Sequence, residues 1–389
     1  MQEGFISWCK ENGVVWNGIE GKLIGDGERG IVATTDLAAD TVILKVPGRL
    51  LLTNRSAERD SRLKATLEGK DLDRDGRLAI HLLHELSKGV ESFWNEYLNL
   101  LPREYHTLMH FSDGEIDALQ FSHGRELALE AVEINRKKWL KCRHVVKELD
   151  LHPKYRSRMA WLWAASTIAS RTMFLPFDEA GALTPFGDFL NYEPPPAPLP
   201  PIGTIPSSGD SNLSGSGQYI ADRDEYHLAT LRSYNAGDQV FMCYGCYTNL
   251  QLLEHYGFLL EENPHDAVPI QPEKLGLDGL HPIDCFAMHN GSPSWEALKH
   301  LRLASCTGKE KGLRYLASAG EPISDSCESR GLVKWRAACR IVLEGSGSSV
   351  EEDMEALGCL GNDHTRLCLA IRWRILQKMI LRRGMNFGL

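Results

Sequence analysis

Two cysteines in the segment 241-FMCYGCYTN-249 have the spacing of a zinc knuckle or of a redox pair. A structural zinc ion needs four ligands, and no second CxxC or paired histidine motif lies near Cys243 and Cys246. A thioredoxin-type pair lies at a helix N-terminus, whereas these thiols follow a strand-like run and flank a turn. We therefore favour ordinary thiols, with zinc or redox chemistry as the alternative. Tyr244, which lies between them, is the other residue here that could do chemistry.

The segment 25-GDGERG-30 matches the glycine pattern of dinucleotide-binding folds. That pattern requires a helix after the third glycine, because the helix N-terminus meets the pyrophosphate. Here the strand-like 31-IVATT-35 follows, and Asp26 and Glu28 would repel a phosphate. A tight β-turn, with glycines in the left-handed region, is the simpler interpretation. A turn whose backbone groups hold a ligand without phosphate stays open.

Arg171 and Asn191 each allow two interpretations. Arg171 ends the most apolar helix-like run of the chain; it either has a buried partner or reaches solvent at a helix C-terminus, where a cation is favourable. In 186-FGDFLNYEPPP-196 an apolar segment ends at Asn191 before the prolines. Asn191 is either a turn residue or a buried amide that binds a polar ligand beside the carboxylate of Asp188. The sequence contains no HExxH motif.

Composition excludes several classes of protein. The 389 residues predict two or three domains, and the hydrophobic content of 43% is ordinary for a globular protein. The net charge of −9 argues against direct nucleic-acid binding, which needs a basic face, whereas it would attract a basic protein segment. Ten scattered cysteines favour a reducing compartment, so we expect the cytoplasm, the nucleus or both. Residues 1–14 lack the apolar core of a signal peptide, and the run 159–170 is too short to span a bilayer.

The periodicity of apolar residues predicts an α+β fold whose strands are split by a helical block. The expected strands are 22–25, 30–35, 41–46, 183–191, 226–232 and 239–244. The expected helices are 5–12, 78–102 with a break at Gly89, two within 113–149, 154–174, and 249–256 with Thr248 or Asn249 as its cap and Gly257 at its end. Beyond residue 265 the chain is mainly helical. The Pro-rich and Ser/Gly-rich stretch 193–217 is expected to be a flexible surface loop.

Five segments in this order resemble the SET-domain methyltransferases, and in particular the branch typified by the Rubisco large-subunit methyltransferase. The segments are 29–53, 92–102, 161–174, 186–192 and 239–258. The resemblance covers residues 1–265 well and implies a SET domain of small curved antiparallel sheets, with a helical insertion at about 56–174. It further implies an all-α substrate-binding domain over 266–389. The segment that carries Tyr244 is expected to be threaded beside the segment that ends at Asn191.

The resemblance also implies the roles of individual residues, with Tyr244 as the catalytic tyrosine and the flanking cysteines as incidental. The implied cofactor is S-adenosylmethionine, whose methionine carboxylate would meet Arg171 in a charge-assisted pair. The residues implied for the cofactor are Glu28, Arg29, Gly30, Arg171, Asn191, Tyr192 and Tyr244. The residues implied for the substrate amine and its channel are Ser170, Met173, Asp188, Tyr256 and Phe258. The expected partner is a protein segment that bears a lysine, and the chain is expected to be a monomer.

Two departures from the family pattern bear on activity. Tyr192 stands where the family usually has histidine, and Glu28 stands where it has the first glycine of a Gly-x-Gly pair. A SET-fold interaction protein without catalysis therefore stays open. The histidine-directed relatives carry a polar amide two residues after the arginine, where this chain has Met173. Because an apolar side chain cannot hydrogen-bond an imidazole, we expect a lysine target, with a protein-histidine methyltransferase as the alternative.

Overall fold

The computed structural model describes residues 2–24, 28–195, 217–271, 285–361 and 365–388, and these divide into two compact units. The described part of the first unit consists of residues 2–24, 28–110, 131–195 and 217–246, and that of the second consists of residues 111–130 and the described residues from 247 onward. The flexible loop predicted at 193–217 lies almost wholly outside the described residues. The domain boundary expected at residue 265 stays a prediction.

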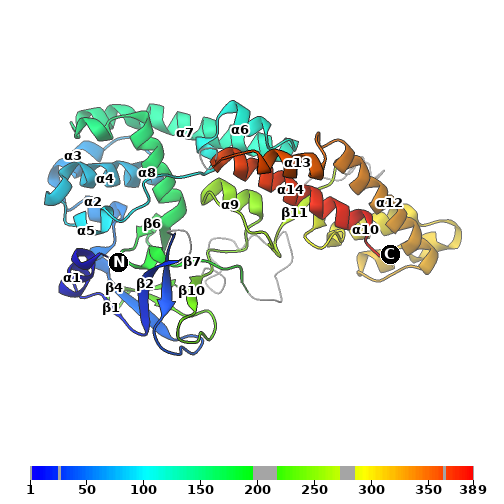
Figure 1. Cartoon of the computed structure of the whole chain (residues 1–389), viewed down its shortest axis with the longest axis horizontal. Coiled ribbons are helices and arrows are strands. Elements are labelled where there is room, and N and C mark those ends of the chain that lie inside the picture. The colour runs from blue at the N-terminus through cyan, green and yellow to red at the C-terminus, as the bar shows by residue number, and fades with distance from the viewer. Residues whose placement is uncertain (1, 25–27, 196–216, 272–284, 362–364, 389) are drawn as a thin grey trace. The chain divides into compact units, whose positions relative to one another are not determined.

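The first unit contains two four-stranded sheets and a two-stranded one, which confirms the predicted α+β class (Figure 1). The first sheet has the order β1 (Val15–Trp16), β4 (Val42–Pro47), β9 (Glu225–Ala229), β8 (Gly217–Ile220). The second has the order β2 (Ile19–Ile24), β3 (Glu28–Ala33), β10 (Gln239–Met242), β7 (Asn191–Tyr192). The small sheet pairs β5 (Thr172–Leu175) with β6 (Asp178–Leu183). All of the strand pairs are antiparallel except β10 with β7.

The hairpin of β2 and β3 decides how the glycine-rich segment is to be interpreted. Ile24 pairs with Glu28, and β3 continues as a strand through Ala33, so a strand rather than a helix follows Gly30. The dinucleotide-binding interpretation is therefore wrong. A Cβ on Gly30 would lie 2.0 Å from Ile24 Cδ1 and 2.9 Å from Gln239 Nε2. A larger residue at this position would therefore require the side chains of Ile24 and Gln239 to move.

The segment before Asn191 differs from its predicted form. Residues 183–191 were expected to form one strand, but β6 ends at Leu183 and a 3-10 turn, η5 (Gly187–Phe189), follows. Phe186 takes a left-handed φ of 74°, and its fully buried ring packs 5.2 Å from the ring of Trp16. Tertiary packing therefore bends a segment whose apolar sequence favours a strand.

The parallel pair of β7 and β10 brings distant parts of the chain together. Asn191 pairs with Phe241 and Tyr192 pairs with Met242. The prediction that the Tyr244 segment lies beside the Asn191 segment is confirmed. Strands β9 and β10 are consecutive in the chain but lie in different sheets, since β9 pairs with β4 and β10 pairs with β3.

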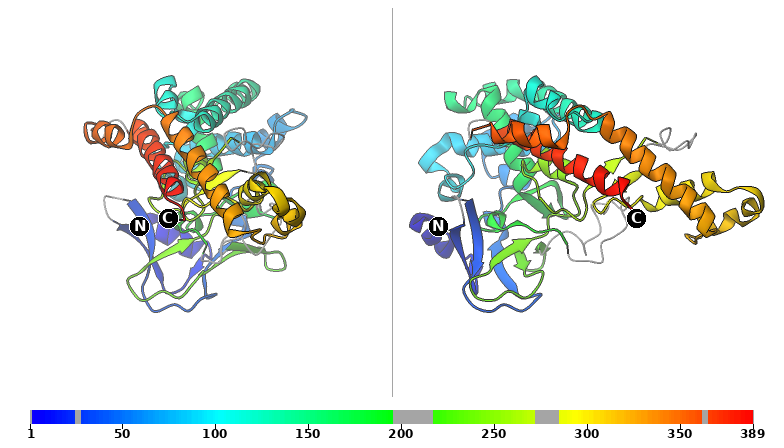
Figure 2. Two further views of the ribbon diagram at one scale, coloured as in Figure 1. Left: turned by 90° about the vertical axis from the view of Figure 1, so that its right-hand side faces the viewer. Right: turned by 45° about the vertical axis from the view of Figure 1, so that its right-hand side comes forward.

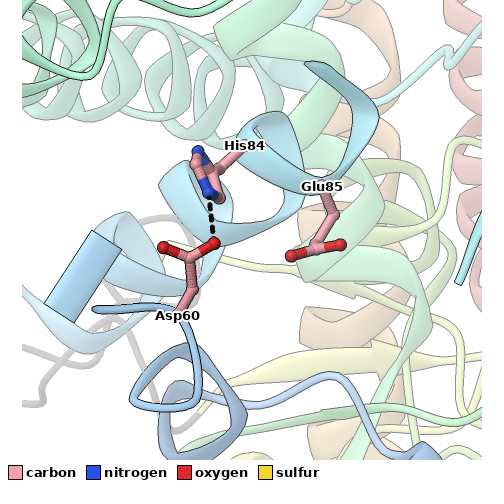
Figure 3. Close-up of side chains that lie close together, drawn as sticks. All are labelled: Asp60, His84 and Glu85. Atoms are coloured by element: carbon pink, nitrogen blue, oxygen red, sulfur yellow. Dashed lines mark hydrogen bonds and ion pairs between the residues drawn. The ribbon is translucent and has the colours of Figure 1, made fainter. Parts of the chain in front are cut away.

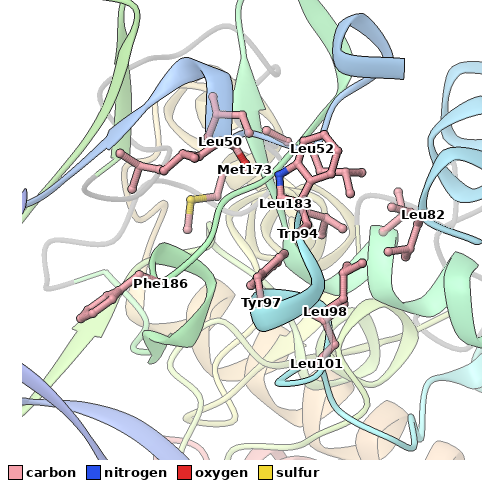
Figure 4. Close-up of a cluster of buried hydrophobic side chains, with 14 of the residues drawn as sticks. Leu50, Leu52, Leu82, Trp94, Tyr97, Leu98, Leu101, Met173, Leu183 and Phe186 are labelled. Atoms are coloured by element: carbon pink, nitrogen blue, oxygen red, sulfur yellow. Dashed lines mark hydrogen bonds between the residues drawn. The ribbon is translucent and has the colours of Figure 1, made fainter. Parts of the chain in front are cut away.

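The helices of the first unit pack on these strands through one apolar core. They are α1 (Glu3–Glu11), α2 (Asn54–Ala57), α3 (Ser61–Leu67), α4 (Arg74–Lys88), α5 (Asn95–Leu98) and α8 (Arg158–Arg171). Helix α4 ends at Gly89, whose φ of 58° explains the predicted break. Side chains of α4 and α5 such as Leu82, Tyr97 and Leu98 belong to the same buried cluster as Leu183 of β6 (Figure 4). The helical insertion is therefore part of the core that carries the strands.

The second unit is mainly helical, as predicted. Its helices are α6 (Asp113–Asp117), α9 (Asn249–His255), α10 (Trp295–Ser305), α11 (Arg314–Ser318), α12 (Asp325–Glu344), α13 (Val350–Gly358) and α14 (Thr365–Met385), while α7 (Ser122–Glu148) begins in it and ends in the first unit. Helices α12 and α14 lie side by side (Figure 2). A short sheet of β11 (Ala267–Pro269) and β12 (Phe286–Met288) was not predicted. Thr248 caps α9 with a capping box, as expected. No helix in the described part of the chain is long and apolar enough to cross a membrane.

Candidate active site

Arg171 and Asp188 form a buried ion pair at the end of α8. Arg171 Nη1 donates to the main-chain oxygen of Asp188 over 2.8 Å and lies 3.3 Å from its Oδ2. The Asp188 side chain is 1% exposed and that of Arg171 is 22% exposed. Of the two interpretations of Arg171, the structure therefore shows the buried partner. Burial raises the pKa of Asp188, and the nearby Arg171 offsets that rise only in part.

The phenol of Tyr97 reaches the same carboxylate from the helical insertion. Its hydroxyl donates to Asp188 Oδ2 over 2.9 Å. Tyr97 was not predicted as a site residue, because in the sequence it only occupies one apolar position of a helix. Two polar atoms of the ion pair, Arg171 Nε and Asp188 Oδ1, are buried and have no hydrogen-bond partner among the described residues. An unpaired donor and an unpaired acceptor of opposite charge suit a ligand that carries both charges.

Asn191 joins β7 to β3. Its Nδ2 donates to the main-chain oxygen of Arg29 over 3.1 Å, so the amide that was expected to bind a ligand ties two predicted site residues together. The Arg29 guanidinium lies 5.1 Å from the centroid of the Phe189 ring and donates to the main-chain oxygen of Leu100. A cavity of about 470 Å³ opens here, and Arg29 and Gly30 line it together with Phe189 and residues 99–103.

Tyr244 lies directly beyond β10 and faces the end of η5. Its half-buried side chain donates a hydrogen bond of 2.6 Å from the hydroxyl to the main-chain oxygen of Leu190. Burial raises the pKa of this hydroxyl well above its usual range, so the phenol is neutral at physiological pH. Since its proton is held by a carbonyl, its oxygen keeps lone pairs for another contact.

Tyr192 contacts the turn that contains Tyr244 and Gly245. Its hydroxyl donates to the main-chain oxygen of Gly245 over 2.8 Å, and its ring lies 5.2 Å from that of Tyr244. The tyrosine that replaces the family histidine thus has a structural role in this chain. Gly245 itself takes a φ of 138°, which favours glycine in this turn.

Cys243 and Cys246 are free thiols, the first buried and the second half-buried. Neither belongs to a cluster of three metal-ligand atoms among the residues that the structure describes. Such a cluster occurs at Asp60, His84 and Glu85 (Figure 3). There, however, the ammonium of Lys88 lies 2.9 Å from Asp60 and 2.5 Å from Glu85, so a protein cation already neutralises these carboxylates.

Five predicted residues are not part of this arrangement. Ser170 donates its hydroxyl proton to the main-chain oxygen of Ser166 over 2.7 Å, within α8. Met173 is 7% exposed and belongs to the apolar core. Tyr256 and Phe258 lie in the second unit, with their rings 6.1 Å apart. The backbone of Glu28 begins β3, and its side chain lies outside the described residues. The roles of all five stay predictions.

Comparison with known proteins agrees with the fold. The family model "SET domain" matches residues 28–245, and "Rubisco LSMT substrate-binding" matches residues 259–381. Protein SET DOMAIN GROUP 40 of Arabidopsis thaliana is 36% identical over 347 residues, which cover 84% of this chain and 70% of that protein. The actin-histidine N-methyltransferase of Canis lupus familiaris is 25% identical over 424 residues, which cover 98% of this chain and 68% of that protein.

The solved structures include one of the SET domain of LSMT bound to lysine and AdoHcy. It matches with a TM-score of 0.67 at 21% identity and covers 99% of this chain and 90% of that chain. At this identity the likeness concerns the fold. Two other findings show the family. The SET model matches more than half of the chain, and the SET-domain relative from Arabidopsis is 36% identical. The chain therefore belongs to the SET-domain family of S-adenosylmethionine-dependent protein methyltransferases.

Proposed function

We propose that this methyltransferase modifies the ε-amine of a lysine in a protein substrate, and that Tyr244 is its catalytic tyrosine. The observation that carries the proposal is the neutral phenol of Tyr244, held by the Leu190 carbonyl at the edge of the sheet that also carries Arg29 and Asn191. The phenol oxygen can accept weak C–H···O contacts from a methyl group and so align it. Alignment of this kind contributes several kcal/mol to a transfer reaction.

The residues present fit the cofactor. When bound, S-adenosylmethionine supplies a methyl group activated by its sulfonium. The unpaired Nε of Arg171 would donate to the cofactor carboxylate, and the unpaired Oδ1 of Asp188 gives an adjacent negative charge. Arg29, Gly30, Asn191 and Tyr192 would hold the remainder, mostly through main-chain groups, because the side chains of Asn191 and Tyr192 already bind protein oxygens.

The substrate amine must be neutral to use its lone pair. An apolar channel lowers the pKa of an amine by desolvation, and this is the role proposed for Phe258 and Tyr256. Ser170 and Asp188 are the proposed hydrogen-bonding partners of the amine. In Ser170 the oxygen stays available as an acceptor, because the hydroxyl proton is donated to Ser166.

The target residue is the finer part of the proposal. Met173 favours lysine, since it cannot hydrogen-bond an imidazole, and a lysine is bound in the similar LSMT structure. Histidine is the second candidate, because actin-histidine N-methyltransferases match 98% of this chain. Histone and other protein substrates both fit a lysine-directed activity.

A labelled-methyl assay tests both candidates. The full chain is incubated with a cell extract and labelled S-adenosylmethionine, and the labelled proteins are hydrolysed to amino acids. We expect labelled methyl-lysine, and we expect Tyr244→Phe to reduce the label strongly. The matched control is Tyr226→Phe, because Tyr226 is a buried tyrosine of β9 outside the site. Labelled methyl-histidine would overturn the lysine proposal, and equal label from Tyr244→Phe would overturn the role of Tyr244.

A further inference from the structure

Tyr97 is a contact of the Arg171–Asp188 pair for which the proposed chemistry has no use. It lies on α5, is fully buried, and donates its hydroxyl proton to Asp188 Oδ2 over 2.9 Å. Arg171 Nη1 lies 3.3 Å from the same oxygen. One carboxylate oxygen thus joins a phenol of the helical insertion to the guanidinium that ends α8.

Asp188 holds Arg171 through its main-chain oxygen, 2.8 Å from Nη1, and through Oδ2, 3.3 Å from Nη1, and Tyr97 acts on the second of these contacts. The other oxygen, Oδ1, has no partner among the described residues, so the phenol and the guanidinium supply the carboxylate's side-chain contacts in this part of the structure. A buried carboxylate needs such donors to stay ionised. If the phenol is removed, Asp188 either takes a proton or draws Arg171 closer, and in both cases the guanidinium changes position or charge environment.

We propose that Tyr97 is a positioning residue, which orients Arg171 toward the cofactor carboxylate by holding Asp188. This inference rests on the proposed function, because it assigns the unpaired Nε of Arg171 to the cofactor. It adds a residue of α5 to the cofactor site, next to Arg171 at the end of α8 and Asp188 in η5.

The ring and the hydroxyl of Tyr97 have separable roles. The ring packs in the core, with centroids 6.5 Å from Phe5 and 6.4 Å from Phe189. Phenylalanine keeps these contacts and removes the bond to Asp188. A purely structural tyrosine would therefore tolerate Tyr97→Phe with unchanged cofactor binding, whereas a positioning residue would not.

The charge state of Asp188 supplies a second readout. The titratable groups that act on it are Arg171, Arg29, Tyr97, Tyr105 and Tyr244. Burial raises the pKa of this carboxylate, and the hydrogen bond from the phenol counteracts the rise. Loss of the phenol raises the pKa further. Since the ionised carboxylate holds Arg171, cofactor affinity declines as the pH falls through this pKa, and the decline begins at a higher pH in the variant.

Calorimetric titration of the full chain with S-adenosylmethionine across the acid-to-neutral range tests the inference. We expect Tyr97→Phe to bind about tenfold more weakly near neutral pH, the order of one hydrogen bond to a charged group. We also expect the acid limb of this variant, that is, the decline of its cofactor affinity as the pH falls, to lie at higher pH than in the wild type. In an Asp188→Asn background, Tyr97→Phe should have no further effect, because the two residues act through one contact. Tyr226→Phe is the control and should bind like the wild type.

The inference is overturned if Tyr97→Phe binds like the wild type at every pH, or if its weakening is the same in the Asp188→Asn background. Should Tyr97→Phe not fold, Asp188→Asn alone must still abolish the acid limb, and an unchanged limb overturns the inference as well. A wild-type chain that binds no S-adenosylmethionine would count against the proposed function. A chain that binds it but labels no lysine would count against the proposed target alone.

Discussion

Removal of the Arg171 side chain gives the sharpest test of how the candidate site is built. In Arg171→Leu, the carboxylate of Asp188 stays 1% exposed in its pocket but loses both the charge and the Nη1 donor beside it. Loss of one partner of a buried pair costs about 3–5 kcal/mol. Because the Arg171 side chain is 22% exposed, we expect the lower end, about 3 kcal/mol in the free energy of unfolding of the first unit.

The loss of unfolding free energy in Arg171→Leu, called the deficit here, has a predictable pH dependence. Burial raises the pKa of Asp188 already in the wild type, and loss of the guanidinium raises it further. A carboxyl whose pKa is higher in the folded than in the unfolded state binds its proton preferentially when folded. The deficit is therefore full at neutral pH and shrinks as the pH falls through the folded-state pKa.

Urea unfolding, followed by tryptophan fluorescence at neutral and at mildly acidic pH, measures both effects. The control is Arg171→Leu combined with Asp188→Asn, which removes the unpaired charge and should recover most of the loss. Equal stability of Arg171→Leu and wild type at neutral pH would refute the reasoning. So would a double variant as unstable as the single one.

Three further changes test other parts of the structure. Gly30→Ala should destabilise the chain by about 1–3 kcal/mol in thermal unfolding, because its Cβ would lie 2.0 Å from Ile24 Cδ1, and Ile24→Ala should relieve the loss. Lys378→Met should cost about 1–3 kcal/mol in urea unfolding, because Asp353, 0% exposed, loses the ammonium 2.6 Å away but keeps the Arg374 guanidinium 2.7 Å away; an unchanged stability would contradict this. Cys246→Ser and a zinc chelator should each leave methyl transfer unchanged, and loss of transfer with either would favour a metal at the paired cysteines.

The sequence predicted the parts of the site that lie in local motifs. The capping box at Thr248 and the turn at Gly89 depend on neighbouring residues alone, and both appear as expected. Arg171 was recognised because a cation at the end of a very apolar helix is unusual. The flanking cysteines were interpreted as incidental because their spacing lacks the context of a zinc or redox site, and this stays a prediction.

The order of the motifs determined the family, the α+β class and the threading of the Tyr244 segment beside Asn191. Periodicity could not show that residues 184–190 turn instead of forming a strand, because the bend depends on Phe186 packing against a ring far away in the chain. It also could not show which oxygen each polar side chain binds. Tyr97 looks like any apolar position of a helix, and only the folded chain brings its hydroxyl to a carboxylate 91 residues later. Caps, turns and residue types can be predicted from neighbouring residues in the sequence. The partners of buried polar groups depend on the tertiary packing, because it excludes water from these groups and brings distant residues into contact with them.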